Sequence, residues 1–165
     1  MDFSRLQRTE LVALAGSALL VISLFVPWFT LSHSPQRATQ LMQGGDPYVC
    51  GAKVYSCTGW ETFPINRWLF LMAAAAPVIL TYFIVTAQRG QYPTGEFTMT
   101  VGFAVIVLVF FNGVVAKPGG DPQFGISLSW GYFLALISGF LIAGAGALRS
   151  LESGGGAQRK PPATF

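Results

Sequence analysis

The only two cysteines of the chain, Cys50 and Cys57, lie in the stretch YVCGAKVYSCTGWETF and are separated by six residues. If this stretch faces a compartment outside the cytoplasm, both thiols meet conditions that permit disulfides, and no other thiol competes for either. Two segments with strand-forming side chains, 49–50 and 54–57, flank a Gly-Ala-Lys turn. Closing so short a loop stabilises by about 2.5 kcal/mol on the chain-entropy model. We therefore expect a structural disulfide that pins a small β-hairpin-like loop.

The same two cysteines have two other possible states, unpaired thiols or a redox-active pair. A Cys-x-x-Cys spacing helps to make a thiol reactive, and these cysteines are farther apart. Four-span thiol oxidoreductases that resemble the quinone-linked disulfide-forming enzymes carry a Cys-x-x-Cys pair and a second pair, whereas this chain has one pair. The sequence thus favours a structural role over a redox role.

Other residues with chemical potential are few and scattered. His33 is the only histidine, so a histidine-based metal site or a Ser-His-Asp arrangement lacks partners. The carboxylates Asp46, Glu61 and Asp121 fall in expected loops and could meet at a cation or act as an acid and base pair. Nothing in their spacing demands this, and we interpret them as residues that keep the loops solvated.

The elements that must position these residues are apolar. The chain is 52% hydrophobic and 10% charged, against about 25% charged in soluble domains. Four stretches lack Asp, Glu, Lys, Arg and His: 11–31, 68–87, 97–116 and 124–148. Each reaches the roughly 20 residues that a helix needs to cross the hydrocarbon layer of a membrane. This pattern predicts four transmembrane helices joined by an outer loop at 32–67, and the lack of ionisable groups in the four stretches argues against a proton-coupled transporter.

The apolar stretches also carry packing signals. Small residues recur every four positions in the last stretch and define one helix face. They are Gly131, Ala135, Gly139, Ala143 and Ala147. We favour packing of this face inside the bundle, with an oligomer or another membrane protein as the alternative. Pro77 predicts a kink in the second stretch, and Asn112, the most polar residue within the spans, is expected to meet water or a loop.

The basic residues indicate the orientation. With both termini on one side, six basic residues lie on that side and four on the other. The first group is Arg5, Arg8, Arg89, Arg149, Arg159 and Lys160, and the second is Arg37, Lys53, Arg67 and Lys117. The excess predicts cytoplasmic termini. Residues 151–165 are rich in Gly, Pro and polar side chains, and we expect a disordered cytoplasmic tail.

Aromatic residues gather on the opposite side in this threading. Indole rings favour the lipid headgroup level, where an apolar body and an N–H donor are both accommodated. We therefore predict an interfacial aromatic belt, with a platform for a partner or lipid as the alternative. Its members are Trp28, Trp60, Phe63, Trp68 and Trp130.

Several short motifs resemble those of small four-span membrane proteins of actinobacteria that are mostly uncharacterised. These motifs are LFVPWFTL, GWETF, AKPGGDP and WGYFLALISGFLIAGAGAL, and together they cover most of the chain. The resemblance implies a bacterial plasma-membrane location and supplies no activity or ligand. The layout is also similar to claudin-type proteins, whose first outer loop carries Trp and a disulfide, although there the Gly-Leu-Trp motif precedes the cysteines.

The expected protein is an all-α integral membrane protein, a four-helix transmembrane bundle over 1–150 with a disulfide-pinned outer loop. The function that we predict is a non-enzymatic envelope or interaction component, without cofactor, metal or nucleic acid. Its expected partners are the lipid bilayer and a second copy or another membrane protein, through the last helix or the outer loop. The alternatives are a membrane thiol-redox or other membrane enzyme accessory and an accessory subunit of a transporter.

Overall fold

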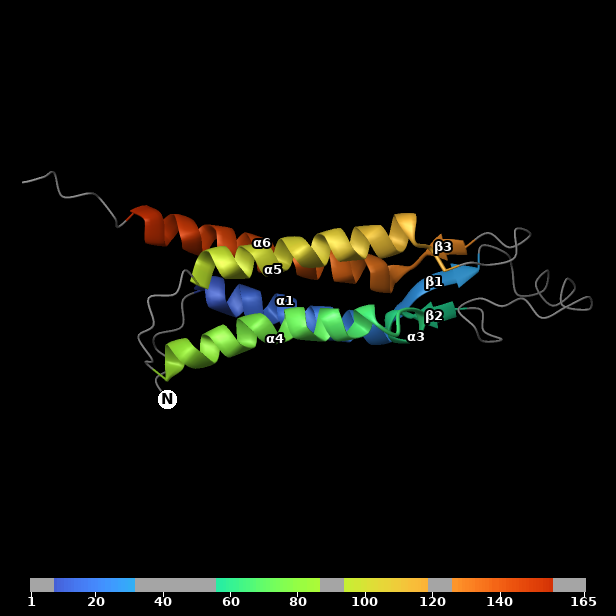
Figure 1. Ribbon diagram of the computed structural model, residues 1–165, viewed down its shortest axis with the longest axis horizontal. Coiled ribbons are helices and arrows are strands. Elements are labelled where there is room, and N and C mark those ends of the chain that lie inside the picture. Colours follow the sequence, from blue (N-terminus) through green and yellow to red (C-terminus); the bar gives the residue numbers. More distant parts are fainter. Residues whose placement is uncertain (1–7, 32–55, 87–93, 119–125, 156–165) are drawn as a thin grey trace, which may run out of the picture.

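The computed structural model describes residues 8–31, 56–86, 94–118 and 126–155. Four long helices run side by side in this part of the chain (Figure 1). They are α1 (Arg8–Phe25), α4 (Asn66–Val85), α5 (Thr94–Phe110) and α6 (Trp130–Gly155). Helix α5 continues as a π-helical turn, η3 (Phe111–Val115). Four helices are long and apolar enough to cross a membrane by length and composition, which confirms the predicted spans at this level.

A small antiparallel sheet closes one end of the bundle, and we call this end the sheet end (Figure 1). Its strands are β1 (Pro27–Leu31), β2 (Ser56–Thr58) and β3 (Ile126–Leu128), in the order β2-β1-β3. Phe29 of the central strand lies opposite Cys57 on one side and Leu128 on the other. The expectation of an all-α protein is therefore corrected to four helices with a three-stranded sheet.

The sheet changes three expected boundaries. The apolar run 11–31 is helical only to Phe25, because Pro27 disfavours a helical residue before it and the chain continues as β1. The run 124–148 contains a strand before α6 begins at Trp130. At the other end α6 continues to Gly155, so the expected tail at 151–165 begins as helix, and residues 156–165 lie outside the described residues.

The hairpin expected around the cysteines lies largely outside the described residues, which resume at Ser56. The described partner of β2 is β1, a strand far away in sequence, and not a neighbouring segment. After β2 the chain enters the short helix α3 (Gly59–Thr62). This helix starts with a capping box, in which the Thr58 hydroxyl accepts from the Glu61 backbone N–H and the Glu61 carboxylate accepts from the Thr58 N–H.

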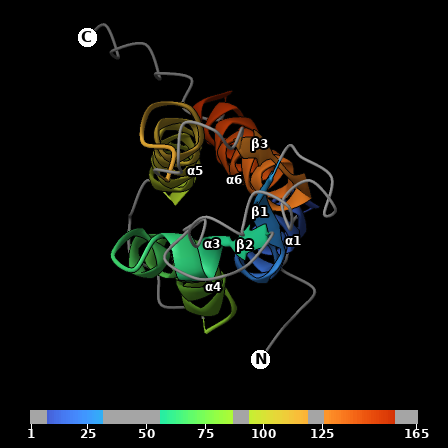
Figure 2. The same ribbon diagram turned by 90° about the vertical axis from the view of Figure 1, so that its right-hand side faces the viewer.

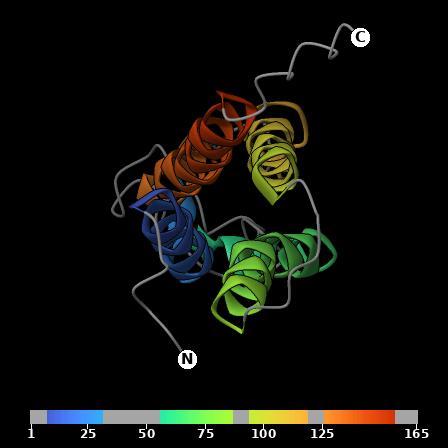
Figure 3. The same cartoon turned by 90° about the vertical axis from the view of Figure 1, so that its left-hand side faces the viewer.

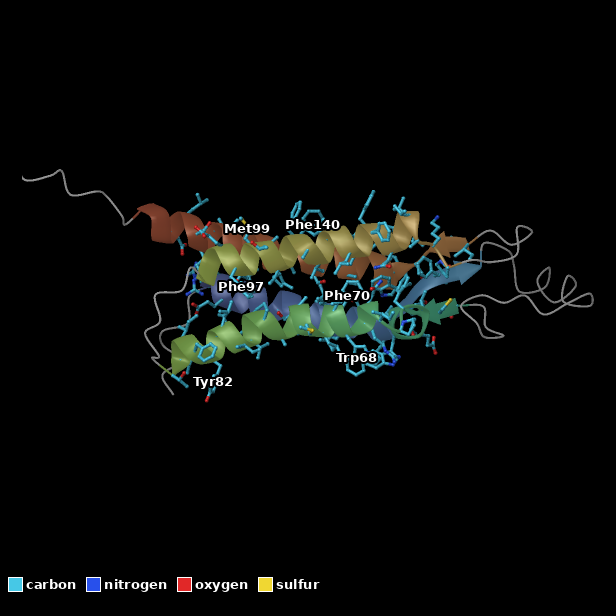
Figure 4. The ribbon with its side chains drawn as sticks, in the orientation of Figure 1. Trp68, Phe70, Tyr82, Phe97, Met99 and Phe140 are labelled. Carbon is cyan, nitrogen blue, oxygen red and sulfur yellow. The ribbon has the colours of Figure 1, made fainter. Side chains whose placement is uncertain are left out.

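The helices do not share the packing equally. Viewed along the bundle, α6 lies beside both α1 and α5, and α4 lies on the other side (Figures 2 and 3). Only 17% of the apolar window of α4 is buried, compared with 33–44% in the other three spans. Some of its side chains, such as Trp68 and Tyr82, project outward along one edge of the bundle, whereas Phe70 is buried (Figure 4). Helix α4 runs through Pro77 without interruption, and the Thr81 hydroxyl donates to the Pro77 carbonyl.

Candidate functional site

Trp28, the second residue of β1, is the centre of the aromatic cluster at the sheet end. Its side chain is completely buried, and its indole N–H donates to the Ser23 carbonyl over 2.7 Å. The rings of Phe63, Phe70 and Tyr132 lie 5.7–6.2 Å from it, centroid to centroid, in tilted or edge-on arrangements. Trp28 therefore joins the end of α1 to α4, α6 and the segment after α3.

Two glycines leave the space that the Trp28 ring occupies. A Cβ atom on Gly59 would lie 2.7 Å from the indole ring, and one on Gly131 would lie 2.5 Å from it. Gly131 also lies against the Val26 and Pro27 carbonyls. The ring is thus held between the start of α3 and the first turn of α6, where any side chain would collide with it.

The predicted interfacial belt divides into buried and exposed members. Trp28 and Phe63 are buried in the protein, so for these two the expectation of a lipid-facing position is wrong. Their burial follows from β1 turning back over the helix ends, which the sequence pattern did not reveal. Trp68 and Trp130 are 56% and 77% exposed, and Trp60 is half-buried.

A hydrogen-bonded asparagine pair links α4 to η3 near the sheet end. The Asn66 amide donates to the Asn112 side-chain oxygen over 2.8 Å, and the Asn112 amide donates to the Leu108 carbonyl over 2.8 Å. Asn112 is 2% exposed, so it is satisfied by protein groups and not by water or a loop as expected. Next to it, Gly113 lies against the Tyr132 ring with no room for a Cβ atom. The π-helical turn thus faces both α4 and α6.

A second cluster at the sheet end surrounds Arg67, in the first turn of α4. The guanidinium carbon lies 4.8 Å from the Trp60 ring centroid and 5.7 Å from the Trp68 ring centroid. Trp60 also stacks on Phe25, the last residue of α1, at 5.5 Å. From the sequence, Arg67 was assigned only to the group of basic residues, although its place between Trp60 and Trp68 in the chain was the available signal.

At the opposite end, a polar cluster joins all four long helices. The Arg149 guanidinium on α6 and the Glu10 carboxylate on α1 form an ion pair at 3.0 Å, with side chains 19% and 4% exposed. They line a small cavity together with residues from every long helix. The other lining residues are Thr9, Ala13, Thr81, Thr98, Ala145 and Gly146. The apolar runs 11–31 and 124–148 end just short of these charged residues, whereas helices α1 and α6 extend past them. The candidate membrane helices α1 and α6 therefore include charged residues near their ends.

The small residues predicted in the last span lie at contacts with other elements. Gly139 faces Ile106 of α5, and Ala143 faces Gly102 of α5 so closely that Gly102 has no room for a Cβ atom. Ala135 is fully buried, and Ala147 is half-buried. The contacts on α5 come from residues that the sequence analysis did not single out.

The other candidate residues give no catalytic arrangement in the described part of the chain. No group of three or more His, Cys, Asp or Glu residues that could hold a metal occurs there. Glu61 serves in the helix cap of α3. Cys57 is buried in β2, and no disulfide pair falls within the described residues, because Cys50 lies outside them together with His33, Asp46 and Asp121.

No protein family, curated protein or solved structure matches this chain. The class of protein is therefore defined by the fold, a bundle of four candidate membrane-spanning helices closed at one end by a three-stranded sheet.

Proposed function

We propose that this protein is a non-enzymatic component of the bacterial plasma membrane that presents the loop 32–55 to a partner. In this proposal the sheet end faces outward and both termini are cytoplasmic. The distribution of basic residues supports the orientation. The resemblance of its motifs to small four-span proteins of actinobacteria agrees with a plasma-membrane location.

The observation that carries the proposal is the pairing of the two strands that flank this loop. Thr30, near the end of β1, lies opposite Ser56, the first residue of β2. The chain thus leaves and re-enters the described structure at adjacent positions of one sheet. On its other side β1 pairs with β3, and Thr30 hydrogen-bonds to Ser127 through their hydroxyls. A loop with both ends fixed in this way is positioned by a rigid scaffold, which is typical of recognition loops.

A Cys50–Cys57 disulfide belongs to the same proposal. Cys57 is 1% exposed and lies opposite Phe29 in the sheet. A bond to Cys50 would attach the C-terminal part of the loop to this strand. The burial of Cys57 argues against the thiol-redox alternative, because exchange requires that a thiolate reach the sulfur.

Site-specific photocrosslinking in cells tests the interaction. A photoreactive amino acid at Gln43, within the loop, should give a discrete adduct with another protein. The matched controls are Glu152, exposed near the opposite end, and Met72, 71% exposed on α4. A protein adduct from Met72 but not from Gln43 would contradict the proposal and favour a subunit that docks through its helices.

A further inference from the structure

The cluster around Arg67, formed by Phe25, Trp60, Arg67 and Trp68, brings a cation to the surface of the sheet end. Its members come from the end of α1, from α3 and from the first turn of α4. Trp60 and Trp68 meet edge to face at 6.0 Å, and the Phe25 ring stacks on the Trp60 ring. The two indoles therefore form a fixed frame around the guanidinium group.

The charge of Arg67 has no matching anion among the residues that the structure describes. One guanidinium N–H, on Nη1, donates to the Trp60 carbonyl at 3.5 Å, which is a long contact. The Nε–H is covered and has no hydrogen-bond partner. Among the described residues no carboxylate pairs with Arg67, and the nearby Glu61 accepts from the Thr58 N–H and hydroxyl instead. A guanidinium group that is positioned by aromatic rings, and whose charge is not neutralised by a carboxylate, can bind an anion.

The depth of the Arg67 cluster in the membrane indicates which anion it binds. Arg67 lies where α4, a candidate membrane span, begins. The side chain of Trp68 beside it is 56% exposed, and Trp130, at the start of α6, is 77% exposed at the same end of the bundle. Exposed tryptophans at helix ends lie at the depth of the lipid headgroups. The groups available to an arginine at this depth are the phosphates of the lipids, and an anionic lipid has no choline or ammonium group that would repel the guanidinium.

We propose that Arg67 binds the phosphate group of an anionic glycerophospholipid at the sheet end of the bundle. Nη1 and Nη2 donate to the phosphate oxygens, and the Trp68 ring covers the glycerol region beside them. A planar guanidinium suits this role because it offers two parallel donors to one phosphate. The site goes beyond the proposed function and does not depend on it, since both leaflets of a membrane carry phosphates.

Tryptophan quenching by brominated lipids in vesicles tests the proposal. The full-length protein is placed in phosphatidylcholine vesicles that contain a minor share of brominated phosphatidylglycerol, or in matched vesicles with brominated phosphatidylcholine. The ratio of the two quenching efficiencies reports the preference for the anionic lipid. We expect a ratio well above one for the natural protein, and a ratio of one would overturn the proposal.

The variant Arg67→Gln should lower this preference about fivefold, the scale expected for one basic group at a membrane surface. Lys117→Gln is the matched control, because Lys117 is an exposed cation after η3 that lies outside the cluster. Arg67→Lys keeps the positive charge but loses the two parallel N–H donors of the guanidinium group, so we expect an intermediate preference for the anionic lipid. This variant provides a second test if Arg67→Gln folds poorly. An equal loss in Lys117→Gln and Arg67→Gln would show a diffuse surface charge and refute a site.

Inorganic phosphate distinguishes a lipid from a soluble ligand. In vesicles, added phosphate should leave the preference for the brominated anionic lipid no lower than sulfate does at equal ionic strength. If millimolar phosphate abolishes the preference and sulfate does not, the site binds a soluble phosphate more tightly than the lipid, and the proposal that a lipid is its ligand is overturned.

Discussion

Trp28 illustrates how long-range contacts can bury a side chain that the local sequence places at the lipid interface. A tryptophan after an apolar run predicts a position at the lipid interface. Pro27 instead ends the helical run and starts β1, so the indole turns into the protein between Gly59 and Gly131. Both glycines are visible in the sequence, but their meeting at one ring depends on contacts between residues far apart. Such contacts could not be predicted from local pattern alone.

Replacing Trp28 with Phe should reduce stability, because a smaller ring without an N–H leaves a cavity and loses the bond to the Ser23 carbonyl. We expect a loss of about 2 kcal/mol in the free energy of unfolding. Denaturant unfolding in detergent micelles measures it. Trp130→Phe, at a residue that is 77% exposed, serves as the control and should change stability by less than about 0.5 kcal/mol. Equal effects of the two substitutions would contradict the central place of Trp28.

At the scale of elements, the sequence predicted the α6 side of the contact between α5 and α6 but not the α5 side. The small residues of α6 follow a helical spacing and were predicted as a packing face. Their counterparts on α5, Gly95 and Gly102, are seven residues apart, as are Ser150 and Ala143, the α6 residues that they lie against. Gly95 lies against Ser150, Gly102 against Ala143, and Gly146 against Met99. The matching spacing was the signal for this antiparallel pair.

Gly146→Ala should separate α5 from α6, because the added Cβ atom would collide with the Met99 backbone. Overpacking of this kind costs about 1–3 kcal/mol. Gly144→Ala is the matched control on the same helix, since nothing lies within 4 Å of the position of its Cβ atom. There the higher helix propensity of Ala should leave stability unchanged or raise it by up to about 1 kcal/mol. Thermal unfolding of both variants in the same detergent measures the difference, and a stable Gly146→Ala protein would argue against this helix contact.

The short strands explain most of what the sequence did not predict about the elements. Strands β2 and β3 have three residues each, too few for an alternating pattern to be recognised. They pair with β1 across long stretches of chain, and only this pairing makes them strands. The helices were predictable because their apolar length is a local property, whereas the sheet is not.

On the scale of the whole molecule, different interactions hold the helices together at the two ends of the bundle. The sheet and the Trp28 cluster join the helices at one end, and the Glu10–Arg149 pair joins α1 to α6 near the other. A search for uncharged runs excludes such residues by definition, so the sequence could not show that the two charges meet inside the bundle.

Glu10→Gln should weaken the end of the bundle opposite the sheet, because Arg149 would lose its charged partner in a mostly buried position. We expect a loss of about 1–3 kcal/mol, less than for a fully buried pair because Arg149 is 19% exposed. Replacing both residues with Leu should restore much of the stability, since the two partly buried charges of this pair are removed together. Unfolding of Glu10→Leu, Arg149→Leu and the double variant forms a double-mutant cycle. Additive losses would show that Glu10 and Arg149 are not coupled and would contradict a stabilising ion pair.

The accessibility of the loop sulfurs in intact cells tests the central claim, a sheet end that presents a pinned loop outside the membrane. Cells are treated with an impermeant alkylating mass tag, with or without an impermeant reductant, and then quenched and denatured. We predict no tag without reductant and tagging of Cys50 after reduction, with slower reaction of the buried Cys57. Tagging of the cysteines without reductant would show that they are not joined by a disulfide. Protection from both impermeant reagents, with labelling by a permeant one, would place the loop in the cytoplasm and contradict the account.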